Sequence, residues 1–225
     1  MRSAAVLFDF GGTLDADGVA WKERFARLFA AEGMGTSTVR FDPVFYAADD
    51  ALVGTVSETL SFEDTVRQVA LGVAEALGPD DPDLGGRVAA RFLDEARACI
   101  EANRPLLERL AARYRLGIVS NFYGNLATVC DNAELTRLFS VIVDSARVGL
   151  TKPDPRIFFK AVEELGIRPA DATVVGDSLT RDMAGARAAG MRHVWLAPEP
   201  ARQGTPCCPG DRVIRSLREL EGLLL

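Results

Sequence analysis

The chain has 225 residues, 48% of them hydrophobic, which suits one large domain or a core domain with a smaller inserted one. Its formal net charge of −6 argues against nucleic acid or an anionic membrane as the main partner. No apolar run approaches membrane-spanning length, and the first residues do not form a secretory signal. The four cysteines have neither metal-ligand nor disulfide spacing. We therefore expect a cytoplasmic protein with reduced thiols.

The single histidine, His193, narrows the possible chemistry. Nucleophilic catalysis by a Ser/His/Asp or Cys/His set needs a histidine beside the nucleophile, and imidazole-based zinc sites need two or three. His193 lies in a short run that is typical of a late strand, where we expect a structural role. The sequence therefore disfavours these classes of enzyme.

Five short apolar runs predict strands, and helical periodicity separates the later ones. The predicted strands are residues 4–8, 116–119, 141–143, 173–175 and 193–196. The predicted helices between them are residues 125–138, 155–165 and 179–189. Strands that alternate with helices favour an α/β fold with a doubly wound, Rossmann-like parallel sheet.

More than one hundred residues separate the first predicted strand from the second, which is too long for an ordinary crossover connection. We therefore predict an inserted helical domain at residues 16–100. It is inserted into a core domain formed by residues 1–15 and 101–225.

The inserted stretch has apolar residues at helical spacing in three places: from Trp21 to Phe29, from Phe62 to Leu77, and from Leu84 to Ile100. Ser61 and Gly78 flank the second stripe as a helix start and a helix end would. These stripes predict the core of a helical bundle. Residues 198–210 are rich in proline and glycine, which predicts a loop. Cys207 and Cys208 are expected to be small residues of this loop.

The most informative segment is residues 5–14, Ala-Val-Leu-Phe-Asp-Phe-Gly-Gly-Thr-Leu. An apolar run ends on Asp9, and Gly11 and Gly12 then allow the backbone to approach a ligand closely. In open α/β sheets, ligands bind beyond the carboxyl ends of the strands. Polar residues at or after the later runs should therefore converge on the same crevice: Ser120, Asn121, Lys152 and Asp177.

These positions resemble, in order and spacing, the four motifs of the haloacid dehalogenase-like (HAD) hydrolases. Residues 9–13 resemble the first motif, Asp-x-Asp-x-Thr, and the run ending on Ser120 and Asn121 resembles the second. Thr-Lys-Pro around Lys152 resembles the third, and residues 174–182 resemble the fourth. The helical insert resembles the cap of subfamily I, the branch that includes phosphatases, phosphomutases and 2-haloacid dehalogenases.

The resemblance implies a Mg²⁺-dependent phosphatase. Asp9 would attack phosphorus and form an aspartyl-phosphate. One Mg²⁺ would be held by Asp9, Asp177 and the main-chain carbonyl of Gly11. Lys152 would neutralise the transferring phosphoryl group, and Asp182 would orient Lys152 or the metal shell. The residues implied to bind the phosphoryl group are Ser120, Asn121, Gly12, Thr13 and Lys152.

Gly11 departs from the family pattern, because the second aspartate of the first motif normally serves as general acid and base. Such catalysis contributes typically about 10²–10⁴-fold. Asp15 and Asp17 lie just downstream and are candidates to act through water. Substrates whose leaving group has a low pKa, such as acyl or aryl phosphates and sugar 1-phosphates, would depend less on a general acid.

Other functions remain open. A 2-haloacid dehalogenase-type hydrolase usually has tyrosine where Gly11 stands and lacks the acid pair of the fourth motif. A phosphonatase would need a Schiff-base lysine in the cap, where the sequence has only Lys22. A catalytically impaired HAD-fold protein that binds a phosphorylated ligand is suggested by Gly11 alone.

We predict a phosphatase that acts on a small phosphorylated metabolite. The identity of the substrate and the oligomeric state stay open. Candidate substrate contacts are Trp21, Lys22, Arg24, Phe122 and Tyr123.

Overall fold

Six parallel strands form one sheet in the computed structural model, which describes residues 4–78, 81–197 and 212–225. The strands are β1 (Ala5–Phe8), β2 (Arg115–Ser120), β3 (Val141–Asp144), β4 (Ala172–Gly176), β5 (Arg192–Leu196) and β6 (Arg212–Ile214). Their order is β3-β2-β1-β4-β5-β6, and every neighbouring pair is parallel. The strand order reverses between β1 and β4, as in doubly wound sheets, so the predicted fold class is confirmed.

The first five strands coincide with the five predicted runs to within one residue at each end. The three-residue strand β6 was not predicted, because so short a segment shows no clear periodicity. The loop predicted at residues 198–210, which includes Cys207 and Cys208, lies outside the described residues.

Helices cover both faces of the sheet, because successive side chains of a strand point to opposite sides. Val6 and Phe8 of β1 share one apolar cluster with helices on the first face, and Ala5 and Leu7 share another with helices on the second. The first face is covered by the end of α4 (Leu84–Ala111), by α5 (Leu126–Asn132) and by α9 (Leu220–Leu224). The second face is covered by α7 (Pro155–Glu164) and α8 (Ala184–Ala188).

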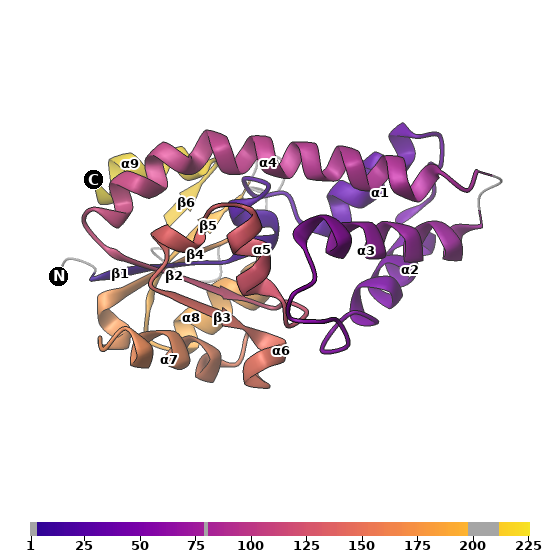
Figure 1. The fold of residues 1–225 in the computed structure, drawn as a ribbon. Coiled ribbons are helices and arrows are strands. Elements are labelled where there is room, and N and C mark those ends of the chain that lie inside the picture. Colours follow the sequence, from indigo (N-terminus) through magenta and orange to yellow (C-terminus); the bar gives the residue numbers. More distant parts are fainter. Residues whose placement is uncertain (1–3, 79–80, 198–211) are drawn as a thin grey trace.

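Beyond the carboxyl ends of the strands, a group of helices gathers at one end of the molecule (Figure 1). They are α1 (Trp21–Ala31), α2 (Thr38–Asp50), α3 (Phe62–Leu77) and the first part of α4, and we call them the inserted helices. The predicted limits of α3 are confirmed: the Ser61 hydroxyl accepts a hydrogen bond from the Asp64 N–H, and Gly78 ends the helix at φ +67°.

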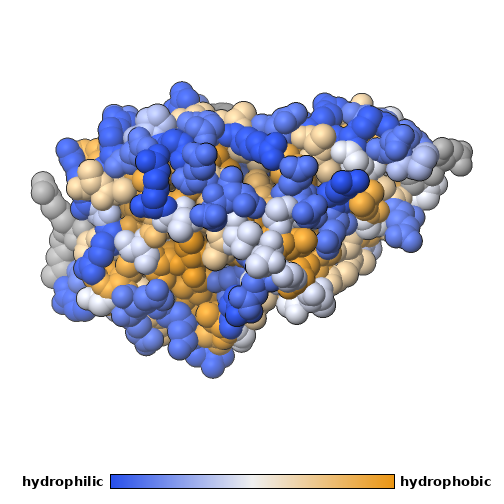
Figure 2. All heavy atoms as spheres, in the orientation of Figure 1, coloured by the Kyte–Doolittle hydropathy of each residue, from blue (hydrophilic) through white to orange (hydrophobic). Residues whose placement is uncertain are grey.

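Helix α4 is 28 residues long and joins the two ends of the molecule. Its first part packs against α1 and α3, and its last part lies over the sheet. The helix continues through residues 100 and 101, so no break marks the predicted end of the insertion, and the division into two domains stays a prediction. Hydrophilic side chains cover the outer side of α4 in Figure 2. Among the described residues, no helix combines the length and apolar character needed to cross a membrane.

Candidate active site

A cavity of about 700 Å³ opens between the carboxyl ends of the strands and the inserted helices. This volume lies within the range of about 300–1,000 Å³ that is typical of small-molecule sites. The residues that line it from the sheet side include Asp9, Gly11, Ser120, Asn121, Lys152, Asp177 and Asp182. Those that line it from the inserted helices include Trp21, Lys22, Phe45, Tyr46 and Asp49. Most residues predicted for the site thus meet at one cavity.

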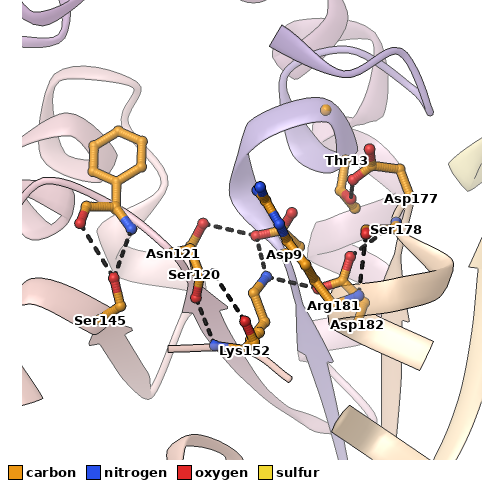
Figure 3. Close-up of polar contacts among 12 residues, drawn as sticks. Asp9, Thr13, Ser120, Asn121, Ser145, Lys152, Asp177, Ser178, Arg181 and Asp182 are labelled. Atoms are coloured by element: carbon orange, nitrogen blue, oxygen red, sulfur yellow. Dashed lines mark hydrogen bonds and ion pairs between the residues drawn. The ribbon is translucent and has the colours of Figure 1, made fainter. Parts of the chain in front are cut away.

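Asp9 lies directly after β1, and its side chain is 10% exposed. The Ser120 hydroxyl donates a hydrogen bond of 2.7 Å to Asp9 Oδ1 (Figure 3). Lys152 Nζ lies 2.7 Å from the same oxygen. Within the described part of the chain these contacts of the carboxylate fall on Oδ1. One oxygen is therefore fixed, and Oδ2 accepts no hydrogen bond from the residues that the structure describes.

Lys152 is buried and bridges two carboxylates, because its Nζ also lies 2.6 Å from Asp182 Oδ1. Burial lowers the pKa of Lys152, but the negative charges of Asp182 and Asp9 outweigh this effect and raise the pKa above its usual value. Asn121 fixes the lysine main chain: its Oδ1 accepts from the Lys152 N–H at 2.7 Å, and its Nδ2 donates to the Lys152 carbonyl at 3.2 Å. The lysine is therefore a permanently charged and firmly positioned cation.

Asp177 completes a cluster of three carboxylates after β1 and β4. One oxygen from each of Asp9, Asp177 and Asp182 lies within 4.8 Å of the others. Burial and the charges of Asp9 and Asp182 raise the pKa of Asp177 well above its ordinary value. Burial also raises the pKa of Asp182 to about 6, although Lys152 opposes this shift. The cluster therefore holds more negative charge than Lys152 alone compensates.

Gly12 and Thr13, predicted to bind the phosphoryl group, contact Asp177 instead of lining the cavity. The Thr13 hydroxyl donates to Asp177 Oδ1 at 3.0 Å. A Cβ on Gly12 would lie 2.7 Å from Asp177 Oδ2, and the residue has φ +90°, so a larger side chain is excluded there. The main chain of Asp177 is held by Trp195, whose indole N–H donates to the Asp177 carbonyl at 2.8 Å. Asp182 Oδ2 accepts from the Ser178 N–H at 3.0 Å.

The space beside Gly11 is filled by the indole of Trp21. A Cβ on Gly11 would lie 3.2 Å from Trp21 Nε1. This nitrogen donates to Asp15 Oδ2 at 2.7 Å, and Asp15 Oδ1 accepts from the Gly12 N–H at 2.7 Å. Arg24 donates to the same carboxylate at 2.8 Å. Asp15 thus joins the loop after Asp9 to helix α1.

These contacts correct two predictions made from the sequence. Asp15 and Asp17 were candidates for the missing acid, but Asp15 is fully buried in its contacts with Trp21 and Arg24. Asp17 Oδ1 accepts from the Leu217 N–H, 200 residues away in the chain. Arg24 was a candidate substrate contact, but it is buried against Asp15 and does not line the cavity.

Several lining residues were missed from the sequence, among them the charged residues Asp49 and Arg181. Asp49 lies near the end of α2, one and two turns after the buried Phe45 and Phe41, so it continues their face of the helix. The Tyr123 hydroxyl donates to Asp49 Oδ1. The sequence did contain a signal for Asp49, because this aspartate continues the helical spacing of the apolar residues Phe41 and Phe45. Arg181 is exposed beside Asp182 and carried no signal.

The sequence model of the haloacid dehalogenase-like hydrolase family matches residues 4–190. The chain belongs to the haloacid dehalogenase-like hydrolases. This HAD hydrolase is 40% identical over 88 residues to a phosphoserine phosphatase of Thermus thermophilus, covering 39% of this chain and 35% of the relative. The chain spans about a third to a half of the length of the curated relatives that it matches first.

Solved structures of HAD proteins share the fold over the whole chain. The magnesium-bound HAD-hydrolase YfnB of Bacillus subtilis superposes with a TM-score of 0.62 at 23% identity, over 100% of this chain and 99% of that one. A 2-haloacid dehalogenase of Pseudomonas syringae superposes with a TM-score of 0.53 at 25% identity, over 100% and 98%. Because both phosphatases and dehalogenases are similar to this HAD hydrolase, its reaction has to be argued from the site itself.

Proposed function

We propose that this HAD hydrolase is a Mg²⁺-dependent phosphatase that hydrolyses a small phosphorylated metabolite through an aspartyl-phosphate on Asp9. The observation that carries the proposal is the Asp9 carboxylate on the cavity wall, held through Oδ1 by Ser120 and Lys152. A carboxylate fixed through one oxygen beside a buried cation is suited to attack phosphorus with the other. The similarity to a phosphoserine phosphatase supports the same class of reaction. We place the activity in the cytoplasm, because the cysteine pattern favours reduced thiols.

A Mg²⁺ ion fits the carboxylate cluster in charge and in donor type. Three carboxylates lie together, and Lys152 is the cation in contact with two of them. Asp182 is held through both oxygens, by Lys152 and by the Ser178 N–H. The ligands we propose are therefore Asp9, Asp177 and the main-chain carbonyl of Gly11. When bound, the ion would supply a positive charge for the phosphoryl oxygens and accept oxygen ligands only.

The side chains around Asp9 have separate roles in the proposed reaction. Asp9 Oδ2 attacks phosphorus, while Ser120 keeps the carboxylate oriented through Oδ1. Lys152 balances the negative charge that develops on the transferring phosphoryl group, and Asp182 holds the lysine in place. The inserted helices close the far side of the cavity and limit the access of water to the phosphorylated carboxylate.

Dehalogenation is the alternative reaction suggested by the similarity to a 2-haloacid dehalogenase, and the carboxylate cluster counts against it. Attack of a carboxylate on a carbon–halogen bond needs no cation site, yet Asp177 lies beside Asp9 and Asp182 at the cost of a strongly raised pKa. A divalent cation gives that arrangement a function. The phosphatase is therefore the better explanation of the site.

The test is release of inorganic phosphate from a panel of sugar, acyl, alkyl and aryl phosphates, with Mg²⁺ and with EDTA. We expect turnover with Mg²⁺, its loss with EDTA and its return when Mg²⁺ is added in excess. Release of halide from a 2-haloacid without any metal would support the dehalogenase. Absence of turnover on every substrate would contradict the proposal.

The carboxylate cluster also predicts how the stability of the metal-free protein depends on pH. Burial raises the pKa of Asp182 to about 6, above its ordinary value of 3.8, and the pKa of Asp177 is also raised well above its ordinary value. The folded state therefore binds more protons than the unfolded state, and stability falls as pH rises through this interval. We expect the free energy of unfolding in EDTA to be lower by about 1–3 kcal/mol near pH 8 than near pH 5.

Urea unfolding at both pH values, with EDTA and with Mg²⁺, measures this effect. The arginine-paired surface carboxylates have lowered pKa values and titrate below this interval, so they do not mask it. Mg²⁺ should stabilise the protein more at the higher pH, because the deprotonated cluster binds it. Equal stabilisation at both pH values would contradict a site made by these carboxylates.

A further inference from the structure

The loop that carries the nucleophile provides no proton donor for the leaving group. Position 11 is glycine, and the indole of Trp21 fills the space beside it. Asp15 and Asp17 are engaged with α1 and with Leu217. If the molecule supplies an acid, that acid lies elsewhere on the cavity wall.

Among the described residues, six carboxylates line the cavity: Asp9, Glu23, Asp49, Asp50, Asp177 and Asp182. Asp9, Asp177 and Asp182 form the cluster described above. Glu23 and Asp50 are exposed to solvent, so no protein surroundings set either carboxyl group apart as a proton donor. Asp49 is the remaining carboxylate of the six. It is half-buried on α2 and lines the same cavity as Asp9.

The surroundings of Asp49 suit a proton donor. Burial raises the pKa of Asp49, although the Tyr123 hydroxyl and Arg181 oppose this shift and Asp50 adds to it. Burial and the nearby Asp49 raise the pKa of Tyr123 well above its ordinary value, so the phenol keeps its proton. Within the described residues the hydrogen bond to Asp49 is on Oδ1. The phenol therefore fixes one oxygen of the carboxyl group and leaves Oδ2 for a ligand.

We propose that Asp49, positioned by Tyr123, is the general acid of this enzyme and takes the place of the aspartate that Gly11 lacks. The inference rests on the proposed phosphatase function. As the Asp9 Oδ2–phosphorus bond forms, the bond from phosphorus to the leaving oxygen breaks, and that oxygen receives the Asp49 proton. The Asp49 carboxylate then accepts a proton from the water that attacks phosphorus. This attack breaks the Asp9–phosphorus bond, and both carboxyl groups return to their starting forms.

The placement of the acid has a consequence for the substrate. Asp49 lies on an inserted helix and Asp9 lies after β1, so the substrate has to span the cavity from one to the other. Phosphate esters with a leaving oxygen of high pKa, such as alkyl and sugar phosphates, depend most on this proton. The structure thus assigns the enzyme alkyl phosphate esters among its substrates, in spite of Gly11.

The test compares the kcat/KM of two substrates, β-glycerol phosphate with a poor leaving group and p-nitrophenyl phosphate with a good one. The ratio kcat/KM reports the transfer to Asp9, the step in which the leaving group departs. We expect Asp49→Asn to lower kcat/KM for β-glycerol phosphate by about 100-fold or more and that for p-nitrophenyl phosphate by only a few-fold. Tyr123→Phe should show the same bias to a smaller degree.

Glu75→Gln is the control, an exposed carboxylate on the neighbouring inserted helix α3 that does not line the cavity, and it should leave kcat/KM for both substrates unchanged. An equal loss for both substrates in Asp49→Asn would mean a structural role and overturn the inference, as would no loss at all. In both of those cases the native enzyme still releases phosphate, so the proposed function stands. A native protein inactive on both substrates would instead refute the phosphatase itself.

Discussion

Replacing Asp9 by asparagine is expected to lower phosphate release by about four orders of magnitude or more. The amide cannot attack phosphorus, so the aspartyl-phosphate cannot form. The change is nearly isosteric, and the amide oxygen still accepts the Ser120 hydroxyl. Lys152 keeps its contact with Asp182. The measurement is kcat with p-nitrophenyl phosphate and Mg²⁺, a substrate that does not depend on an acid.

Asp171→Asn is a matched control for this variant. Asp171 precedes β4 at the amino end of the strand and pairs with Arg168 on the surface, so its loss should leave kcat unchanged. Both variants should unfold at closely similar temperatures. If Asp9→Asn kept a substantial part of the native rate, a different nucleophile would have to be sought.

The second large effect is expected from Lys152→Met. Methionine has a side chain of similar length but lacks the charged Nζ, which lies 2.7 Å from Asp9 Oδ1 and 2.6 Å from Asp182 Oδ1. Loss of one partner of a buried ion pair typically costs about 3–5 kcal/mol, because the remaining charge is left uncompensated. We expect a loss of that size in the free energy of unfolding near pH 8 in EDTA, together with loss of activity.

The destabilisation caused by Lys152→Met should depend on pH. Below about pH 6 Asp182 is protonated in the folded state, so the missing lysine leaves less unpaired charge. The destabilisation should therefore be smaller near pH 5 than near pH 8. Lys160→Met on the exposed side of α7 is the control and should change stability by no more than about 0.5 kcal/mol. A destabilisation independent of pH would contradict the ion-pair explanation.

The sheet was predictable from the sequence because its central strands are buried on both faces. Such strands are apolar throughout, and the first polar residue marks the point where the chain leaves the sheet. Asp9 and Ser120 are residues of this kind, and both lie on the cavity wall. The limits of α3 were predictable for a similar reason, since Ser61 and Gly78 have local conformational preferences that act without distant contacts.

The partners of the buried polar residues were not predictable in this way. Asp15 looks like an exposed turn residue, but α1 folds back so that Trp21 and Arg24 enclose its carboxylate. Asp49 reaches the cavity because Phe41 and Phe45 turn that face of α2 inward. Both outcomes depend on how helices pack on one another, and spacing along the chain does not specify that packing.

The chain contains only two tryptophans, and both touch the proposed catalytic machinery. Trp21 lies against Gly11, two residues after the nucleophile, and the Trp195 indole donates a hydrogen bond to the Asp177 carbonyl. The intrinsic fluorescence of the protein therefore originates almost entirely at the site. Occupancy by a cation or by a phosphate analogue can be followed in the native chain as a change in emission, with no attached label and no turnover.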